Sequence, residues 1–223
     1  AIYVAEGGFV KLGRNIDIEG SVIIQEANLN MYGDGINVSR QIVVNGGFLG
    51  ATSDFVPGVG NIPAGLTTPS LLATQGAVVN LRNGKFNLDY LRVSGGNVTI
   101  NSATASPISS LETGGIWVNS GGTLTLSLAS FVMNDKSEAF LNGTISLWDN
   151  STANIGIEKN TSFPALNVLS GSNLRLAQEF QSGRYLLTVQ DLEVDWGGII
   201  SSNAAGAGGI NNILVENSIT AAY

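Results

Sequence analysis

Apolar and polar residues alternate along many short runs of this sequence, and this period of two constrains the fold more than any other feature. Two clear runs are Leu124-Thr125-Leu126-Ser127-Leu128 and Val98-Thr99-Ile100. Successive side chains of a strand point to opposite faces of a sheet, so such runs predict strands with one buried face. Gly, Asn, Asp and Ser separate the runs, as they do at turns. The sequence therefore predicts an all-β protein.

A longer and less regular repeat combines a glycine, a spacer and alternating apolar residues. It begins at Gly76, Gly96, Gly122, Gly143 and Gly171, in steps of 20, 26, 21 and 28 residues. Steps of this length fit the coils of a right-handed parallel β-helix or β-solenoid, with unequal steps explained by loops at one corner. The alternative is an irregular antiparallel β-sandwich, jelly-roll-like, with an exchanged terminal strand.

One family is similar in the style of this repeat. The segment Val118-Asn119-Ser120-Gly121-Gly122-Thr123-Leu124-Thr125-Leu126 resembles coils of autotransporter passengers and filamentous-haemagglutinin-like adhesins, and the resemblance extends from Gly76 to Leu176. It implies a right-handed parallel β-helix that is exported to a bacterial surface. It carries over no functional residue.

Local composition divides the chain into five parts. An N-terminal β unit over 1–49 precedes a Pro- and Gly-rich loop or joint over 50–70, and the main β body covers 71–202. A small Gly- and Ala-rich hinge over 203–209 then leads to a β-prone C-terminal tail over 210–223.

Charge and composition exclude several classes of partner. The net charge of −7, with no run of Lys or Arg, would repel a nucleic-acid backbone. The sequence contains no run of about 18 apolar residues, so it predicts no membrane-inserted helix. Only 12% of residues are charged, and Asn, Ser and Thr supply the polarity. Together with Ala1, which fits the small residues at signal-peptide cleavage sites, this predicts a secreted, extracellular or cell-surface protein.

The chain lacks the residues of common active sites. It has no His and no Cys, which excludes His-based catalytic triads, Cys nucleophiles and zinc sites built on these residues. We therefore expect no enzyme and no organic cofactor. The three tryptophans, Trp117, Trp148 and Trp196, are expected in the core, where large apolar side chains usually lie.

The densest group of carboxylates is Asp191, Glu193 and Asp195. On a strand they share one face about 7 Å apart, a spacing that could hold Ca²⁺ through oxygen ligands or place the acid and base of a glycosidase. A solvated strand face is the simpler interpretation. Five Asn-x-Ser/Thr sequons are candidate glycosylation sites: Asn37, Asn97, Asn142, Asn150 and Asn160.

These features predict a structural subunit of an extracellular assembly (a filament, pilus-like fibre, surface layer or virion shell), a homo-oligomer or polymer held by β-strand contacts. A glycan-binding or adhesive β-helix module of a larger surface or phage protein is the alternative. Strand addition between subunits would use one of two terminal segments, although the tail could instead cap its own β-helix. The residues expected in these contacts are Ile210, Ile213, Val215 and Ile219, and at the other end Ile2 and Val4.

Overall fold

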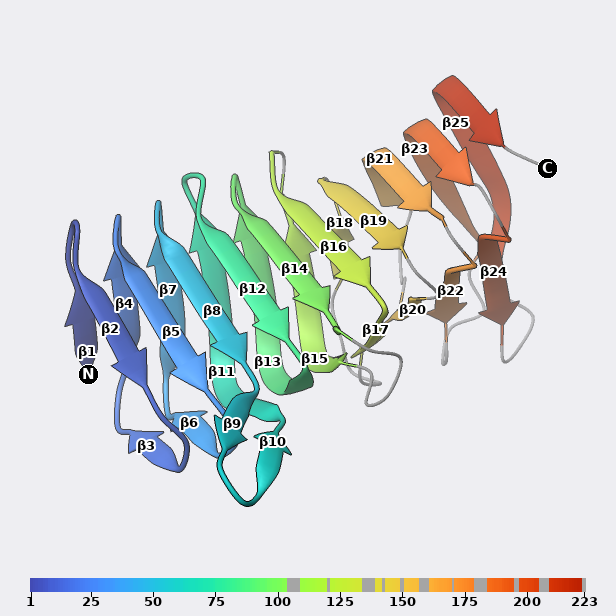
Figure 1. Ribbon diagram of the computed structural model, residues 1–223. Helices are drawn as coiled ribbons and strands as arrows, with labels where there is room; N and C mark the ends of the chain where they lie inside the picture. Colours follow the sequence, from blue (N-terminus) through green and yellow to red (C-terminus); the bar gives the residue numbers. More distant parts are fainter. Residues whose placement is uncertain are drawn as a thin grey trace.

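The protein is a β-solenoid whose strands stack in parallel from coil to coil (Figure 1). The structure, a computed structural model, describes residues 1–103, 109–119, 121–133, 139–141, 143–148, 151–156, 161–169, 171–178, 184–194, 197–204 and 209–221. This part of the chain contains strands and no helix. The expected all-β, parallel β-helix body is confirmed, and the antiparallel sandwich is not the fold.

Each coil passes through three faces, which we number in chain order. The first face holds β1 (Ile2–Val4), β4 (Val22–Gln25), β7 (Gln41–Asn45) and β18 (Ala139–Leu141), together with the second halves of three long strands. The third face holds the first halves of those strands, because they bend at the corner between these faces. The three long strands are β11 (Ala64–Thr74), β13 (Gly84–Ser94) and β15 (Ser109–Val118).

The second and third faces complete the solenoid. The second face is a ten-stranded sheet of β2 (Phe9–Leu12), β5 (Asn28–Tyr32), β8 (Phe48–Thr52), β12 (Val78–Arg82), β14 (Asn97–Asn101), β16 (Thr123–Ser127), β19 (Thr144–Trp148), β21 (Thr161–Val168), β23 (Arg184–Val194) and β25 (Gly209–Ala221). The third face also holds β3 (Ile16–Ile18), β6 (Ile36–Val38), β17 (Ala129–Met133), β20 (Thr152–Gly156), β22 (Asn173–Gln178) and β24 (Ile199–Ala204).

Stacked apolar side chains fill the interior. The register places each inward residue of one coil directly over its equivalent in the next, because the strands are parallel and in step. One such column on the second face consists of Leu29, Leu49, Val79, Val98, Leu124, Ile145 and Leu166, all buried. Burial of each contributes about 1.5–3 kcal/mol relative to exposure. The columns form one hydrophobic cluster that extends from Val4 to Val189.

Glycines shape the corner between the first and second faces. At Gly121 the backbone has a φ of 75°, in the left-handed region that favours glycine. The following Gly122 lies where a Cβ atom would come within 2.6 Å of the Val93 carbonyl oxygen of the coil before. The first glycine thus permits the turn, and the second permits the coils to approach.

The Pro- and Gly-rich segment contains a projecting hairpin. Strands β9 (Asp54–Val56) and β10 (Gly60–Ile62) pair antiparallel and stand out from the solenoid where the chain passes from β8 to β11 (Figure 1). Both large sheets continue past this hairpin, since β8 pairs with β12 and β7 with β11. The residues on either side of it therefore belong to the same stacked faces.

The C-terminal tail pairs with its own chain. Strand β25 lies parallel to β23 along its length, with register shifts after Tyr185 and Val189. Of the expected hinge, residues 205–208 lie outside the described residues. No helix in the described part of the chain is long and apolar enough to cross a membrane.

Candidate functional surfaces

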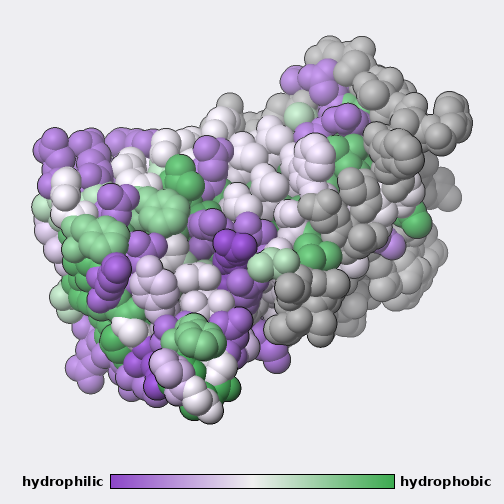
Figure 2. Space-filling model, viewed as in Figure 1, coloured by the Kyte–Doolittle hydropathy of each residue, from purple (hydrophilic) through white to green (hydrophobic). Residues whose placement is uncertain are grey.

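The outward positions of the second face carry mostly uncharged polar side chains. Asn97, Thr123 and Thr144 follow one another in register, and Asn167 donates a hydrogen bond from Nδ2 to Ser146 Oγ at 3.0 Å. Figure 2 views this side and shows hydrophilic and hydrophobic residues interspersed, with hydrophobic residues also on the projecting hairpin. This face is hydrated without carrying much charge.

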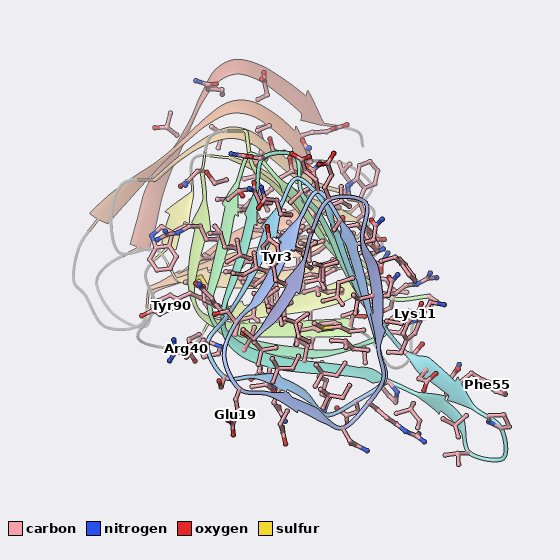
Figure 3. All side chains as sticks on the ribbon, turned by 90° about the vertical axis from the view of Figure 1, so that its left-hand side faces the viewer. Tyr3, Lys11, Glu19, Arg40, Phe55 and Tyr90 are labelled. Atoms are coloured by element: carbon pink, nitrogen blue, oxygen red, sulfur yellow. The ribbon has the colours of Figure 1, made fainter. Side chains whose placement is uncertain are left out.

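The third face carries a column of acidic, amide and hydroxyl side chains on its outside. Asn37 donates from Nδ2 to Asp17 Oδ1 at 2.8 Å, and Thr67, Asn87 and Glu112 continue the same outward column. All five are exposed. Figure 3 places Glu19 at the bottom of the solenoid seen end-on, and Lys11 on the opposite side from Tyr90.

The first face differs from the other two because its central outward column is largely apolar. The register aligns, in order, Tyr3, Ile23, Val43, Leu72, Arg92 and Trp117. An adjoining column is polar and aligns Gln25, Asn45 and Thr74. Gln25 Oε1 accepts a hydrogen bond from the Tyr3 hydroxyl at 3.0 Å, and Thr74 donates to Asn45 Oδ1 at 3.2 Å. An apolar strip bordered by amides and hydroxyls thus lies along the outside of the first face.

Tyr90, Arg92 and Trp117 form a group at one end of this strip, which we call the aromatic shelf. The centroids of the Tyr90 and Trp117 rings are 5.1 Å apart, with their planes tilted by 42°. The guanidinium carbon of Arg92 lies 5.2 Å from the centroid of the Trp117 ring, within the range of a cation–π interaction. Tyr90 remains 49% exposed, so part of this ring surface is open to solvent.

Sequence reasoning placed the tryptophans in the core, and the structure corrects this for two of them. Trp117 is only half-buried and points outward, and Trp148 is 42% exposed on the second face. The alternation gives the signal: Ile116 and Val118 point inward, so Trp117 between them must point outward. Trp196 lies outside the described residues.

The candidate acid row lies on the outside of β23. Asp191 is exposed and Glu193 is half-buried, two residues apart and in register with Ala165 and Asn167 of β21. Asp195 lies outside the described residues. Within the described ranges, no group of three or more His, Cys, Asp or Glu side chains is arranged to hold a metal ion.

The remaining candidate residues are distributed as follows. Among the sequons, Asn37 is exposed on the third face and Asn97 on the second, whereas Asn142, Asn150 and Asn160 lie outside the described residues. At the N-terminus, Ile2 and Val4 pair with Val22 and Ile24, and Val4 is buried in its own core. At the C-terminus, the backbones of four residues pair with β23: Ile210, Ile213, Val215 and Ile219.

Comparison of the chain with protein-family models, with curated proteins and with solved structures gives no match.

Proposed function

We propose that the chain is a structural subunit of an extracellular or cell-surface assembly, that copies associate by β-strand contacts at the ends of the solenoid, and that it is not an enzyme. One observation carries this proposal. Among the described strands, β1 and β2 at one end and β24 and β25 at the other each have a neighbour on one side only. Such edges present unpaired N–H and C=O groups to a further strand.

The direction of the strands suits head-to-tail addition. All strands of the three faces run parallel, so the last coil of one copy would meet the first coil of the next in the orientation that coils have within one chain. A contact between two different ends of the molecule is heterologous and, when it does not close into a ring, generates a filament. The subunit therefore requires no exchange of strands to polymerise, because β1 and β25 can remain paired where they are.

Hydrogen bonding identifies which groups face the open edge. The amide of Ile2 donates to the Ser21 carbonyl oxygen, and the amide of Asn28 donates to the Gly8 carbonyl oxygen. In a parallel pair, alternate residues bond to the same neighbour. The N–H and C=O groups of Tyr3 and Lys11 consequently point away from the solenoid, toward an incoming strand.

The surface chemistry supports a structural role outside the cell rather than catalysis. The outward rows of Asn, Ser and Thr present neutral polar groups to water. The sequence has no His or Cys, and the two described members of the acid row lie on an outer strand face.

The test compares two double variants of the whole chain. Proline at positions 3 and 11 (Tyr3→Pro with Lys11→Pro) removes two edge N–H donors while keeping the N–H groups that bond to the neighbouring strands. Tyr3→Ala with Lys11→Ala removes the same side chains but keeps all the backbone N–H donors, and it is the control. Light scattering after size exclusion, with electron microscopy, should show polymer for the native chain and the alanine variant and monomer for the proline variant. Monomeric native protein at about 100 µM, or equal assembly of all three, would contradict the proposal.

A further inference from the structure

We infer that the aromatic shelf of Tyr90, Arg92 and Trp117 binds an acidic saccharide, with a sugar ring against the two aromatic rings and its carboxylate on the Arg92 guanidinium. This site lies on the first face, away from the ends used for assembly, and its occupation is independent of polymerisation.

A glycine makes the shelf flat. Tyr90 and Gly115 are neighbours in register on the outside of the first face. A Cβ atom on Gly115 would lie 2.8 Å from Cδ1 of Tyr90 and 3.2 Å from Cζ3 of Trp117. The Tyr90 ring therefore occupies the space above Gly115 and leans across toward Trp117. The apolar C–H groups of a pyranose can pack against such an exposed ring surface, whose face carries partial negative charge.

Arg92 supplies the charge that selects an acidic ligand. Its side chain is exposed and stacks on Trp117, and it forms no ion pair with any described residue. A guanidinium presents donors in a planar fork that matches a carboxylate, and stacking on a ring holds that fork in place. The chain has a net charge of −7, so an arginine beside two aromatic rings that pairs with no carboxylate among the described residues gives this part of the first face a positive charge.

The surroundings fit the hydroxyl groups of a sugar. Asn119 donates from Nδ2 to Ser94 Oγ at 3.4 Å, and this pair lies beside the shelf on β13 and the end of β15. Asp89, next to Tyr90 in the sequence, is exposed at the corner with the third face. The apolar strip continues from the shelf through Leu72 and Val43, so a longer saccharide would extend along the solenoid axis at about 4.8 Å per strand.

Two other occupants fit the geometry less well. An extended peptide cannot add to this face as a strand, because β13 is paired with β11 on one side and β15 on the other. A second copy of the chain would need about 800 Å² on each partner for a stable interface, whereas the shelf spans only two adjacent strands. A small ligand with an apolar ring face, hydroxyl groups and a carboxylate fits all three side chains.

The test titrates the full chain with hexamers of mannuronate and galacturonate and with the neutral hexamers of mannose and galactose, by calorimetry and by tryptophan fluorescence. We expect saturable binding of at least one uronate hexamer, at least tenfold stronger than that of its neutral counterpart. Trp117→Ala should weaken it at least tenfold, and Arg92→Gln should abolish the preference for the acidic sugar. Trp148→Ala, which removes an exposed tryptophan from the second face, should have no effect.

Stability is measured separately, because Tyr90 covers Gly115 and Tyr90→Ala is expected to lower the melting temperature. Arg92→Gln alters only an exposed side chain, and its result decides the proposal even where the aromatic variants fold poorly.

The inference is overturned by absence of binding to every hexamer, by equal binding of acidic and neutral hexamers, or by equal losses in the Trp117 and Trp148 variants. It is also overturned if Trp117→Ala dissociates a dimer without affecting sugar binding. The Tyr3→Pro, Lys11→Pro variant should retain the sugar, so the failure of either proposal is distinguishable from the failure of the other.

Discussion

Gly122 lies at a corner where the coil before it approaches more closely than a methyl group allows. Its φ is not in the left-handed region, so alanine is excluded there by the Val93 carbonyl and not by backbone conformation. We expect Gly122→Ala to lower the free energy of unfolding by about 1–3 kcal/mol, as overpacking does. The matched control is Gly13→Ala, where nothing lies within 4 Å of the added Cβ. Because alanine restricts the unfolded chain, Gly13→Ala should stabilise the protein by about 0.4–1 kcal/mol. Urea unfolding of both variants measures this, and equal effects would contradict the steric argument.

Leu124 is fully buried in the stacked column of the second face, between Val98 and Ile145. Replacing it with alanine leaves a cavity that rigid neighbouring coils cannot close, and we expect a loss of about 2–5 kcal/mol in the free energy of unfolding. Thr125→Ala, on the outward side of the same strand, should change the value by less than about 1 kcal/mol. Chemical denaturation followed by circular dichroism measures both. A similar loss for the two variants would show that the column does not provide the stability assigned to it.

The direction of most side chains could be predicted from the sequence, because alternation fixes it once a strand is placed. Leu124 and Leu126 point inward as expected. The shelf could not be predicted, because Tyr90 and Trp117 are 27 residues apart and meet only through the pairing of β13 with β15. That pairing depends on the length of the intervening loop, which local alternation does not reveal.

The hairpin of β9 and β10 is an insertion of defined length. On the second face, Leu29 pairs with Leu49, twenty residues later, whereas Leu49 pairs with Val79, thirty residues later. The extra ten residues match the hairpin, whose Phe55 and Val59 are 69% and 73% exposed. Figure 3 shows Phe55 on the arm that stands out from the solenoid. The hairpin thus adds little to the core.

We expect deletion of the ten residues Asp54–Pro63 to preserve the fold. It would leave three residues (Ser53, Ala64 and Gly65) between Thr52 and Leu66, as many as the coil before has between Tyr32 and Ile36. The melting temperature should stay within about 5 °C of the native value, because no buried column is interrupted. A deletion that also removes Ala64, which is buried and pairs with Gly84, should be clearly less stable. Thermal unfolding of both chains tests this, and an unfolded ten-residue deletion would show that the hairpin holds the coil together.

The glycine repeat predicted the start of a second-face strand correctly in four coils and wrongly in the fifth. Gly76, Gly96, Gly122 and Gly143 all precede strands of the second face, as a repeating corner requires. Gly171 instead precedes β22 on the third face, and the residue that continues the second face after Thr144 is Ala165. It follows Pro164, so this coil lacks the glycine that marks the others. The path of the chain is therefore set by buried columns, and glycine marks a corner only where two coils approach closely.

On the scale of the whole molecule, net charge opposes the assembly that we propose. The chain carries −7 at pH 7, and the residues beyond Arg184 include acids but no Lys or Arg. Head-to-tail addition brings that acidic end against the first coil, whose own charges include Glu6, Asp17 and Glu19 as well as Lys11 and Arg14. Like charge on two approaching bodies raises the free energy of association, and salt screens it over a Debye length of about 10 Å at 0.1 M.

We therefore expect polymerisation to increase when NaCl rises from about 20 mM to about 200 mM at pH 7. It should also increase when the pH falls toward the isoelectric point of about 4.4, where the net charge vanishes. Light scattering at constant protein concentration measures both effects. The variant Tyr3→Pro, Lys11→Pro is the control, because salt should not restore assembly to a chain that lacks the edge donors. Dissociation of the polymer by salt would contradict this expectation. It would mean that ion pairs between the two ends outweigh the net repulsion, and that they, and not backbone hydrogen bonds, provide most of the free energy of association.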